Sequence, residues 1–98
     1  MSEAKNISGT FLFDPTDKIY LEHFPGSPVV PGSLIIDAFV KTLIKQNIIM
    51  KNYTIINFRF RKFIPPGDYT FIITEASSVF SCKLFNGKKT AATGEILI

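Results

Sequence analysis

The stretch HFPGSPVVPGSLIID, residues 23–37, joins a histidine, a loop rich in proline and glycine, and a carboxylate early in an apolar segment. His23 is the only histidine of the chain. Its imidazole can change protonation near neutral pH, and the carboxyl group of Asp37 can share acid–base work. The prolines at 25, 28 and 31 fix φ, so the intervening loop has little conformational freedom. The stretch therefore predicts an acid–base site at the start of a helix.

A helix is predicted for residues 33–47, directly after this loop. Ser33 is the expected N-cap, since it follows the flexible Gly32 and precedes a long apolar run. Apolar side chains spread around the helix circumference instead of keeping to one stripe. We therefore expect a helix that is enclosed on most sides, as by a sheet wrapped around it.

The remaining segments predict strands. Short apolar or alternating runs occupy residues 9–13, 18–21, 53–63, 69–75, 79–85 and 90–98. Within 53–63, phenylalanines alternate with arginines, which is typical of a half-buried strand, and a Pro-Gly break separates it from an antiparallel strand at 69–75. Asn86-Gly87 favours a type I′ hairpin turn. One helix among these strands predicts an α+β layer structure.

Composition limits the class of protein. A chain of 98 residues fits a single domain spanning 1–98, and so much apolar surface on so short a chain indicates self-association. A polar start and no apolar run of about 18 residues predict a cytoplasmic protein without a membrane segment. Cys82 is expected as a buried small hydrophobe within a strand. A net charge of +3 does not predict nucleic-acid binding but is compatible with an acidic partner.

Two readings of Asp37 stand side by side at this point. Lys41 follows it by one helical turn, so the two side chains form an ordinary helix-surface ion pair in one reading. In the other, Asp37 serves chemistry, because it lies between Ile36 and Ala38 in the most apolar part of the helix, where a charge is costly.

Two ordered motifs carry a family resemblance. His23-Phe24-Pro25-Gly26, Pro28-Val29, Pro31-Gly32, Leu34 and Asp37-Ala38 resemble the signature of the β-hydroxyacyl-acyl carrier protein dehydratases, the FabA/FabZ family. Downstream, residues 58–68, FRFRKFIPPGD, resemble the second landmark of this family. The resemblance covers about residues 8–98. It implies the hotdog fold, in which an antiparallel β-sheet wraps one long central helix.

The resemblance also implies roles for individual residues. His23 would be the base that removes the α-proton, and Asp37 of the other subunit of a homodimer would act as the acid for the departing hydroxyl. The backbone N–H of Gly32 would bind the thioester oxygen. Arg59, Arg61 and Lys62 would receive the acidic acyl carrier protein, and no metal or redox cofactor is implied.

The leading hypothesis is accordingly a dehydratase that converts β-hydroxyacyl-acyl carrier protein thioesters to trans-2-enoyl thioesters, in fatty-acid or polyene-type biosynthesis. Three departures from the family pattern keep other readings open: Asp37 stands where FabZ-like members carry Glu, Glu22 replaces a Gly, and Lys41 replaces a Gln. The alternatives are a non-catalytic module that binds a carrier or thioester, and a hotdog thioesterase.

Overall fold

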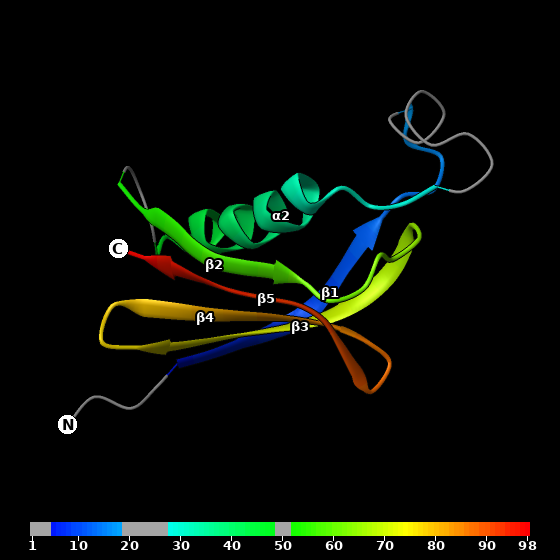
Figure 1. Cartoon of the computed structure of the whole chain (residues 1–98). Coiled ribbons are helices and arrows are strands. Elements are labelled where there is room, and N and C mark those ends of the chain that lie inside the picture. The colour runs from blue at the N-terminus through cyan, green and yellow to red at the C-terminus, as the bar shows by residue number, and fades with distance from the viewer. Residues whose placement is uncertain (1–4, 19–27, 49–51) are drawn as a thin grey trace.

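The computed structural model describes residues 5–18, 28–48 and 52–98. Within them, helix α2 (Gly32–Lys45) lies against one face of a five-stranded antiparallel sheet (Figure 1). The strands are β1 (Lys5–Phe13), β2 (Thr54–Phe60), β3 (Gly67–Ala76), β4 (Val79–Asn86) and β5 (Lys89–Leu97). The predicted α+β architecture, an antiparallel sheet with one long helix packed on it, is confirmed. The predicted extended piece at 18–21 lies outside the described residues apart from Lys18, which is not in a strand.

The order of strands in the sheet is β1-β3-β4-β5-β2. β2 and β3 run in opposite directions, as expected, but they are not neighbours: β2 pairs with β5, and β3 pairs with β1 and β4. Pro65 and Pro66 between them lack the N–H that a continued ladder needs, so no tight hairpin joins the two strands. The chain crosses to another part of the sheet instead.

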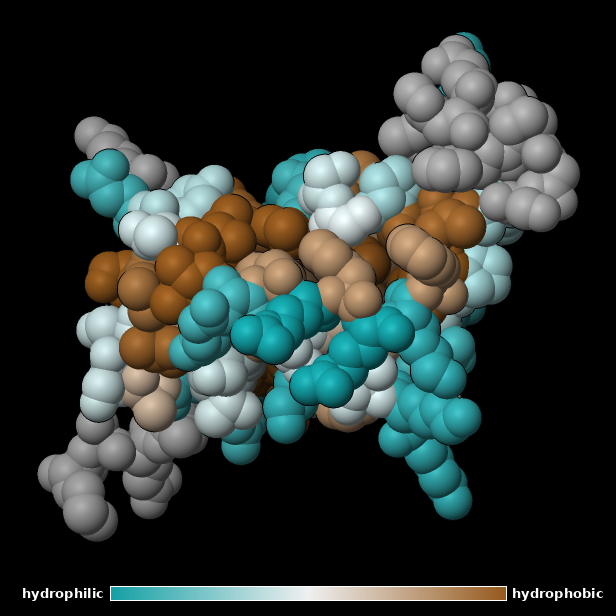
Figure 2. All heavy atoms as spheres, viewed as in Figure 1, coloured by the Kyte–Doolittle hydropathy of each residue, from teal (hydrophilic) through white to brown (hydrophobic). Residues whose placement is uncertain are grey.

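The two faces of the sheet differ in chemistry because successive side chains point to opposite sides. On the helix side, Leu84 pairs with Phe71, and both are buried. Lys83, which precedes Leu84 in β4, points to the outer face. There it forms a row with Thr93 of β5 and Arg59 of β2. In Figure 2, hydrophilic residues form a band across the view, below a hydrophobic area over α2 and β2.

A β-bulge interrupts β2. The register with β5 shifts between Ile56 and Arg59, and Asn57 has a φ of 56°. Beyond the bulge, the ring of Phe58 lies over Gly94 of β5: a Cβ on Gly94 would be 2.3 Å from ring atoms of Phe58. Phe58 thereby reaches Phe39 of α2, with ring centroids 6.1 Å apart. The bulge was not predicted from the alternating pattern.

The helix departs from prediction in two ways. It begins at Gly32 with Pro31 as N-cap, and no side chain caps it, so Ser33 is not the N-cap. Its buried residues are Ile35, Phe39, Val40 and Leu43, which lie on one face, whereas Ile44 is half exposed. The prediction of a helix enclosed on most sides is therefore wrong for the described single chain, because the sheet covers only one side of α2.

The type I′ turn lies in a different hairpin from the one predicted. Ser77 and Ser78, between β3 and β4, both have positive φ (51° and 64°), the signature of a type I′ turn. In the turn between β4 and β5, Gly87 has a φ of 64° and Lys88 does not share a positive value, which fits type II′. The type I′ prediction at Asn86-Gly87 is thus wrong, because Gly87 occupies the first of the two central positions.

No helix within residues 5–18, 28–48 and 52–98 has the length and apolarity that a membrane-spanning helix needs. Cys82 of β4 is buried, as predicted, and burial raises the pKa of its thiol to about 12.

Substitution of Gly94 by Ala should lower the free energy of unfolding by about 1–3 kcal/mol, because the new methyl group would overlap the ring of Phe58. Urea denaturation monitored by circular dichroism measures this loss. The double variant Gly94→Ala/Phe58→Ala should lose less than the sum of the two single variants, since the clash is gone. Strict additivity would contradict the proposed overlap.

The thiol of Cys82 should react with a disulfide reagent far more slowly in the folded chain at pH 8 than in the same chain unfolded in urea. The raised pKa keeps the folded thiol protonated at that pH, and only the thiolate is nucleophilic. The thiol of the unfolded chain ionises at a lower pH than the buried thiol of the folded chain. The free energy of unfolding should therefore also decrease as the pH rises from about 9 toward 12. Equal reaction rates in the two states would contradict burial of Cys82.

Candidate functional site

The N-terminus of α2 is the first feature of the site. Pro31 is extended (φ −61°, ψ 143°), and its carbonyl accepts from the N–H groups of Leu34 (3.0 Å) and Ile35 (3.4 Å). Among the described residues, the N–H groups of Gly32 and Ser33 have no acceptor. Unpaired N–H groups at a helix N-terminus carry partial positive charge. This end of α2 can therefore receive a developing negative charge.

An apolar pocket of about 350 Å³ opens at this helix end. Its walls come from the segment before α2, from the first turn of α2 and from the end of β2, namely Val29, Val30, Pro31, Gly32, Ile35, Phe60, Lys62 and Phe63. The N–H of Val30 donates to the carbonyl of Ile64 (2.9 Å), which ties the segment before the helix to the segment after β2. The pocket is thus built where two distant parts of the chain meet.

Gly32 lets the ring of Phe60 come close to the start of the helix. A Cβ on Gly32 would be 2.7 Å from two ring atoms of Phe60, so only a residue without a side chain lets the ring approach the helix. Phe60 is about two-fifths exposed (41%), and Phe63 almost fully so (86%). Aromatic surface therefore remains open around the mouth of the pocket.

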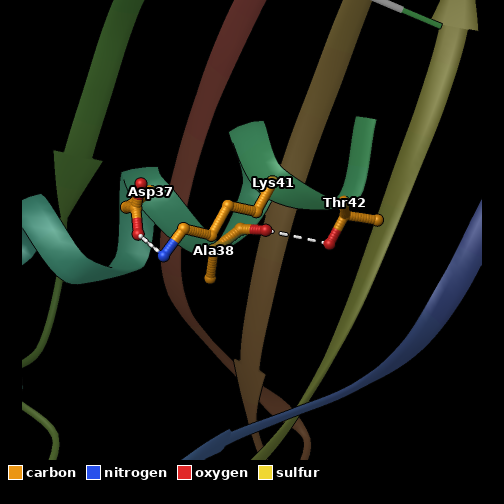
Figure 3. Close-up of polar contacts among 4 residues, drawn as sticks. All are labelled: Asp37, Ala38, Lys41 and Thr42. Atoms are coloured by element: carbon orange, nitrogen blue, oxygen red, sulfur yellow. Dashed lines mark hydrogen bonds and ion pairs between the residues drawn. The ribbon is translucent and has the colours of Figure 1, made fainter. Parts of the chain in front are cut away.

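Asp37 lies one turn further along α2, outside this pocket. Its Oδ2 atom is 2.8 Å from Nζ of Lys41 (Figure 3), and the two side chains are 47% and 74% exposed. Together they line a separate hollow of about 240 Å³, beside Asp14 and Asp17. The surface ion-pair reading of Asp37 therefore describes the contact that the single chain makes. Within one chain, the structure does not bring Asp37 and Gly32 into the same pocket.

His23 lies outside the described residues, so its position relative to Asp37 stays a prediction. The same holds for the predicted approach of these two groups across a dimer. Among the residues that are described, no group of three or more His, Cys, Asp or Glu side chains is arranged to hold a metal ion.

The three predicted basic residues divide between the two faces of the sheet. Lys62 lines the apolar pocket on the helix side. Arg59 and Arg61 line a polar groove of about 400 Å³ on the outer face, next to Lys83. The sequence alone does not assign Lys83 to this groove, because only the registers of β4 and β2 against β5 place it across Thr93 from Arg59.

Comparison with known proteins adds independent information. The family model described as ApeI dehydratase (ApeI-like) matches residues 1–95. The chain is 34% identical to a 3-hydroxyacyl-[acyl-carrier-protein] dehydratase FabZ of Caldicellulosiruptor saccharolyticus, over 97% of this chain and 71% of the relative. It is 29% identical to a protein of the same name from Wolbachia pipientis subsp. Culex pipiens, over 83% of this chain and 66% of the relative.

Solved structures share the fold. A chain of the dehydratase heterocomplex ApeI:P from Xenorhabdus doucetiae superposes with a TM-score of 0.76 at 20% identity, covering 97% of this chain and 92% of that one. A mutant of the fluoroacetyl-CoA-specific thioesterase FlK superposes with a TM-score of 0.57 at 14% identity, over 98% of this chain and 84% of that one. These similarities show the hotdog fold.

A double-mutant cycle of Asp37→Asn and Lys41→Met should give a coupling energy of about 0.2–0.5 kcal/mol, the usual range for an exposed i,i+4 pair. Urea denaturation of the four proteins measures it, and the coupling should shrink at high salt. A coupling above about 1.5 kcal/mol that salt does not reduce would show instead that the pair is shielded from solvent.

Proposed function

The chain belongs to the ApeI-like dehydratase family, and on that premise we propose that it removes water from β-hydroxyacyl thioesters carried by acyl carrier protein. The products would be trans-2-enoyl thioesters, and the pathway would be of the fatty-acid or polyene type. The observation that supports this proposal most is the N–H of Gly32, which has no acceptor among the described residues and lies at an apolar pocket.

The pocket suits an acyl thioester in both size and polarity. Its volume of about 350 Å³ is within the range of small-molecule sites and exceeds the roughly 150 Å³ of an apolar cavity that binds benzene. Phe60 and Ile35 supply apolar contacts for the chain of the substrate. A thioester oxygen that accepts from the Gly32 N–H would gain stabilisation as negative charge develops on it.

The elimination needs two proton transfers. In the proposed mechanism, His23 removes the α-proton, and the electrons of that C–H bond form the new double bond through an enolate-like state held at Gly32. The Cβ–O bond breaks, and Asp37 supplies the proton with which the hydroxyl leaves as water. Lys41 contacts Oδ2 of Asp37, so Oδ1 is the oxygen that would carry this proton. The elimination involves no net oxidation or reduction, so the reaction calls for no redox cofactor.

A homodimer would complete this site. We propose that His23 of one protomer meets Asp37 of its partner, since Asp37 lies outside the pocket of its own chain. Large apolar side chains left exposed by the single chain, such as Leu12 (64%) and Ile44 (47%), support association. Arg59, Arg61 and Lys62 are proposed to bind the acidic carrier.

A non-catalytic carrier-binding module is the second candidate, and the Asp37–Lys41 ion pair favours it. A carboxylate held by a lysine at 2.8 Å is engaged elsewhere than in proton donation. This candidate predicts carrier binding without turnover.

The deciding experiment incubates the purified protein with β-hydroxyacyl carrier thioesters of several chain lengths and follows the product by mass spectrometry. We expect loss of one water. His23→Ala and Asp37→Asn should each lower turnover by about 10²–10⁴-fold, because each removes one proton-transfer group. Lys45→Gln, at the far end of α2, is the control and should retain activity.

Each other outcome has a distinct meaning. Turnover at no chain length would refute the enzyme proposal, and binding of the carrier would then leave the non-catalytic module. Release of free thiol would identify a thioesterase instead.

A further inference from the structure

The β-bulge of β2 lies just before the residues that line the apolar pocket. The register of β2 against β5 shifts between Ile56 and Arg59. Asn57 and Phe58 therefore both lie opposite Gly94, so β2 carries one extra residue at this point. Asn57, the first residue of the bulge, has a φ of 56°. A positive φ at this position is characteristic of the G1 type of bulge, in which the residue is usually glycine.

The extra residue changes which side chains of β2 face the helix. Before the bulge, Ile55 pairs with the buried Ile96 on the helix side of the sheet. Side chains alternate along a regular strand, so Arg59, four residues after Ile55, would also face the helix if β2 had no bulge. In the structure Phe60 lines the pocket on the helix side and Arg59 lines the groove on the outer face. The bulge thus exchanges an arginine for a phenylalanine on the side that faces α2.

This exchange builds one wall of the apolar pocket. The rings of Phe58 and Phe60 lie on the helix side with their centroids 6.4 Å apart. The ring of Phe60 is so close to the helix start that a Cβ on Gly32 would be 2.7 Å from two of its atoms. Asn57 itself lines only the groove on the outer face. The position of the pocket wall therefore depends on the backbone of a residue that does not touch the pocket.

Two properties suit Asn57 to the bulge. Asparagine adopts a positive φ more readily than most residues other than glycine, whereas a β-branched residue there is a rare outlier. The side chain of Asn57 also donates from Nδ2 to Oε1 of Glu95 (2.9 Å), which joins the bulge to β5. Glycine would supply the first property alone. Conformation and hydrogen bond can therefore be separated by substitution.

We infer that Asn57 is a positioning residue for the apolar pocket and that it acts through Phe60. Its left-handed backbone places the ring of Phe60 against Gly32 and directs Arg59 away from the helix. Loss of the bulge would withdraw this apolar wall and turn a charge toward the pocket, so binding of an apolar group should weaken. The inference rests on the proposed function in one respect: it takes the acyl group of the thioester as the occupant.

The structural test compares Asn57→Val and Asn57→Gly with Ser77→Val. Ser77, in the turn between β3 and β4, has a φ of 51°, so Ser77→Val places valine at a similar φ away from the pocket. Nuclear Overhauser spectroscopy detects the contact between ring protons of Phe60 and Hα of Gly32. We expect Asn57→Val to lose this contact and the other two variants to keep it. Circular dichroism verifies folding, and Asn57→Ala, a milder change, takes the place of a valine variant that does not fold.

Ligand binding and kinetics provide the second readout. With a β-hydroxyacyl thioester of N-acetylcysteamine, Asn57→Val should raise KM about tenfold and leave kcat nearly unchanged, as expected when a contact to the bound group is lost. Calorimetry with an unreactive acyl-pantetheine amide should show a similar rise in Kd. Asn57→Gly and Ser77→Val should stay close to the unsubstituted protein in both measurements.

The outcomes separate the inference from the dehydratase proposal. An unchanged Phe60–Gly32 contact and unchanged affinity for the amide in Asn57→Val would overturn the positioning role, whatever the turnover. Equal losses in Asn57→Gly or Ser77→Val would also overturn it, because the left-handed conformation of Asn57 would then not be the cause. Loss of contact and of amide binding in Asn57→Val alone, with no turnover even by the unsubstituted protein, would support the positioning role and refute the dehydratase.

Discussion

Close contact between two aromatic rings of β2 and two glycines organises the functional half of this structure. The ring of Phe60 lies against Gly32 at the start of α2, and the ring of Phe58 lies over Gly94 of β5. A Cβ on either glycine would overlap the adjacent ring. These contacts hold the N-terminus of the helix against the edge strand, and the apolar pocket forms at that junction. They also fix which side of β2 faces the helix, so Arg59 must face outward.

A cluster of phenylalanines anchors the rest of the helix. Phe39 of α2 makes edge-to-face contacts with Phe11 of β1 and Phe71 of β3, at centroid distances of 5.1 and 5.9 Å, while Phe11 and Phe71 stack on each other at 4.0 Å. Such pairs add about 0.5–1.5 kcal/mol each beyond the area they bury. The helix is thus held at its middle by β1 and β3 and at its N-terminus by β2.

A single chain brings only some residues of the candidate site together. Gly32, Phe60 and Lys62 meet at the pocket. Asp37 lies outside it and contacts Lys41, the lysine that stands where the family resemblance implies a glutamine.

The sequence by itself determined the helix, the strand segments and the two faces of the strands, because these follow from periodicity and turn residues. It placed the helix start within one residue, at Ser33 instead of Gly32, and it offered the ion pair of Asp37 with Lys41 as one of two readings, since these two residues are one helical turn apart in the sequence. Only the tertiary structure decided that β2 pairs with β5, that Asn57 forms a bulge, that Phe60 covers Gly32, and that Lys83 lies in the same row as Arg59. These relations depend on contacts between residues far apart in the chain, and no local pattern encodes the register that brings them together.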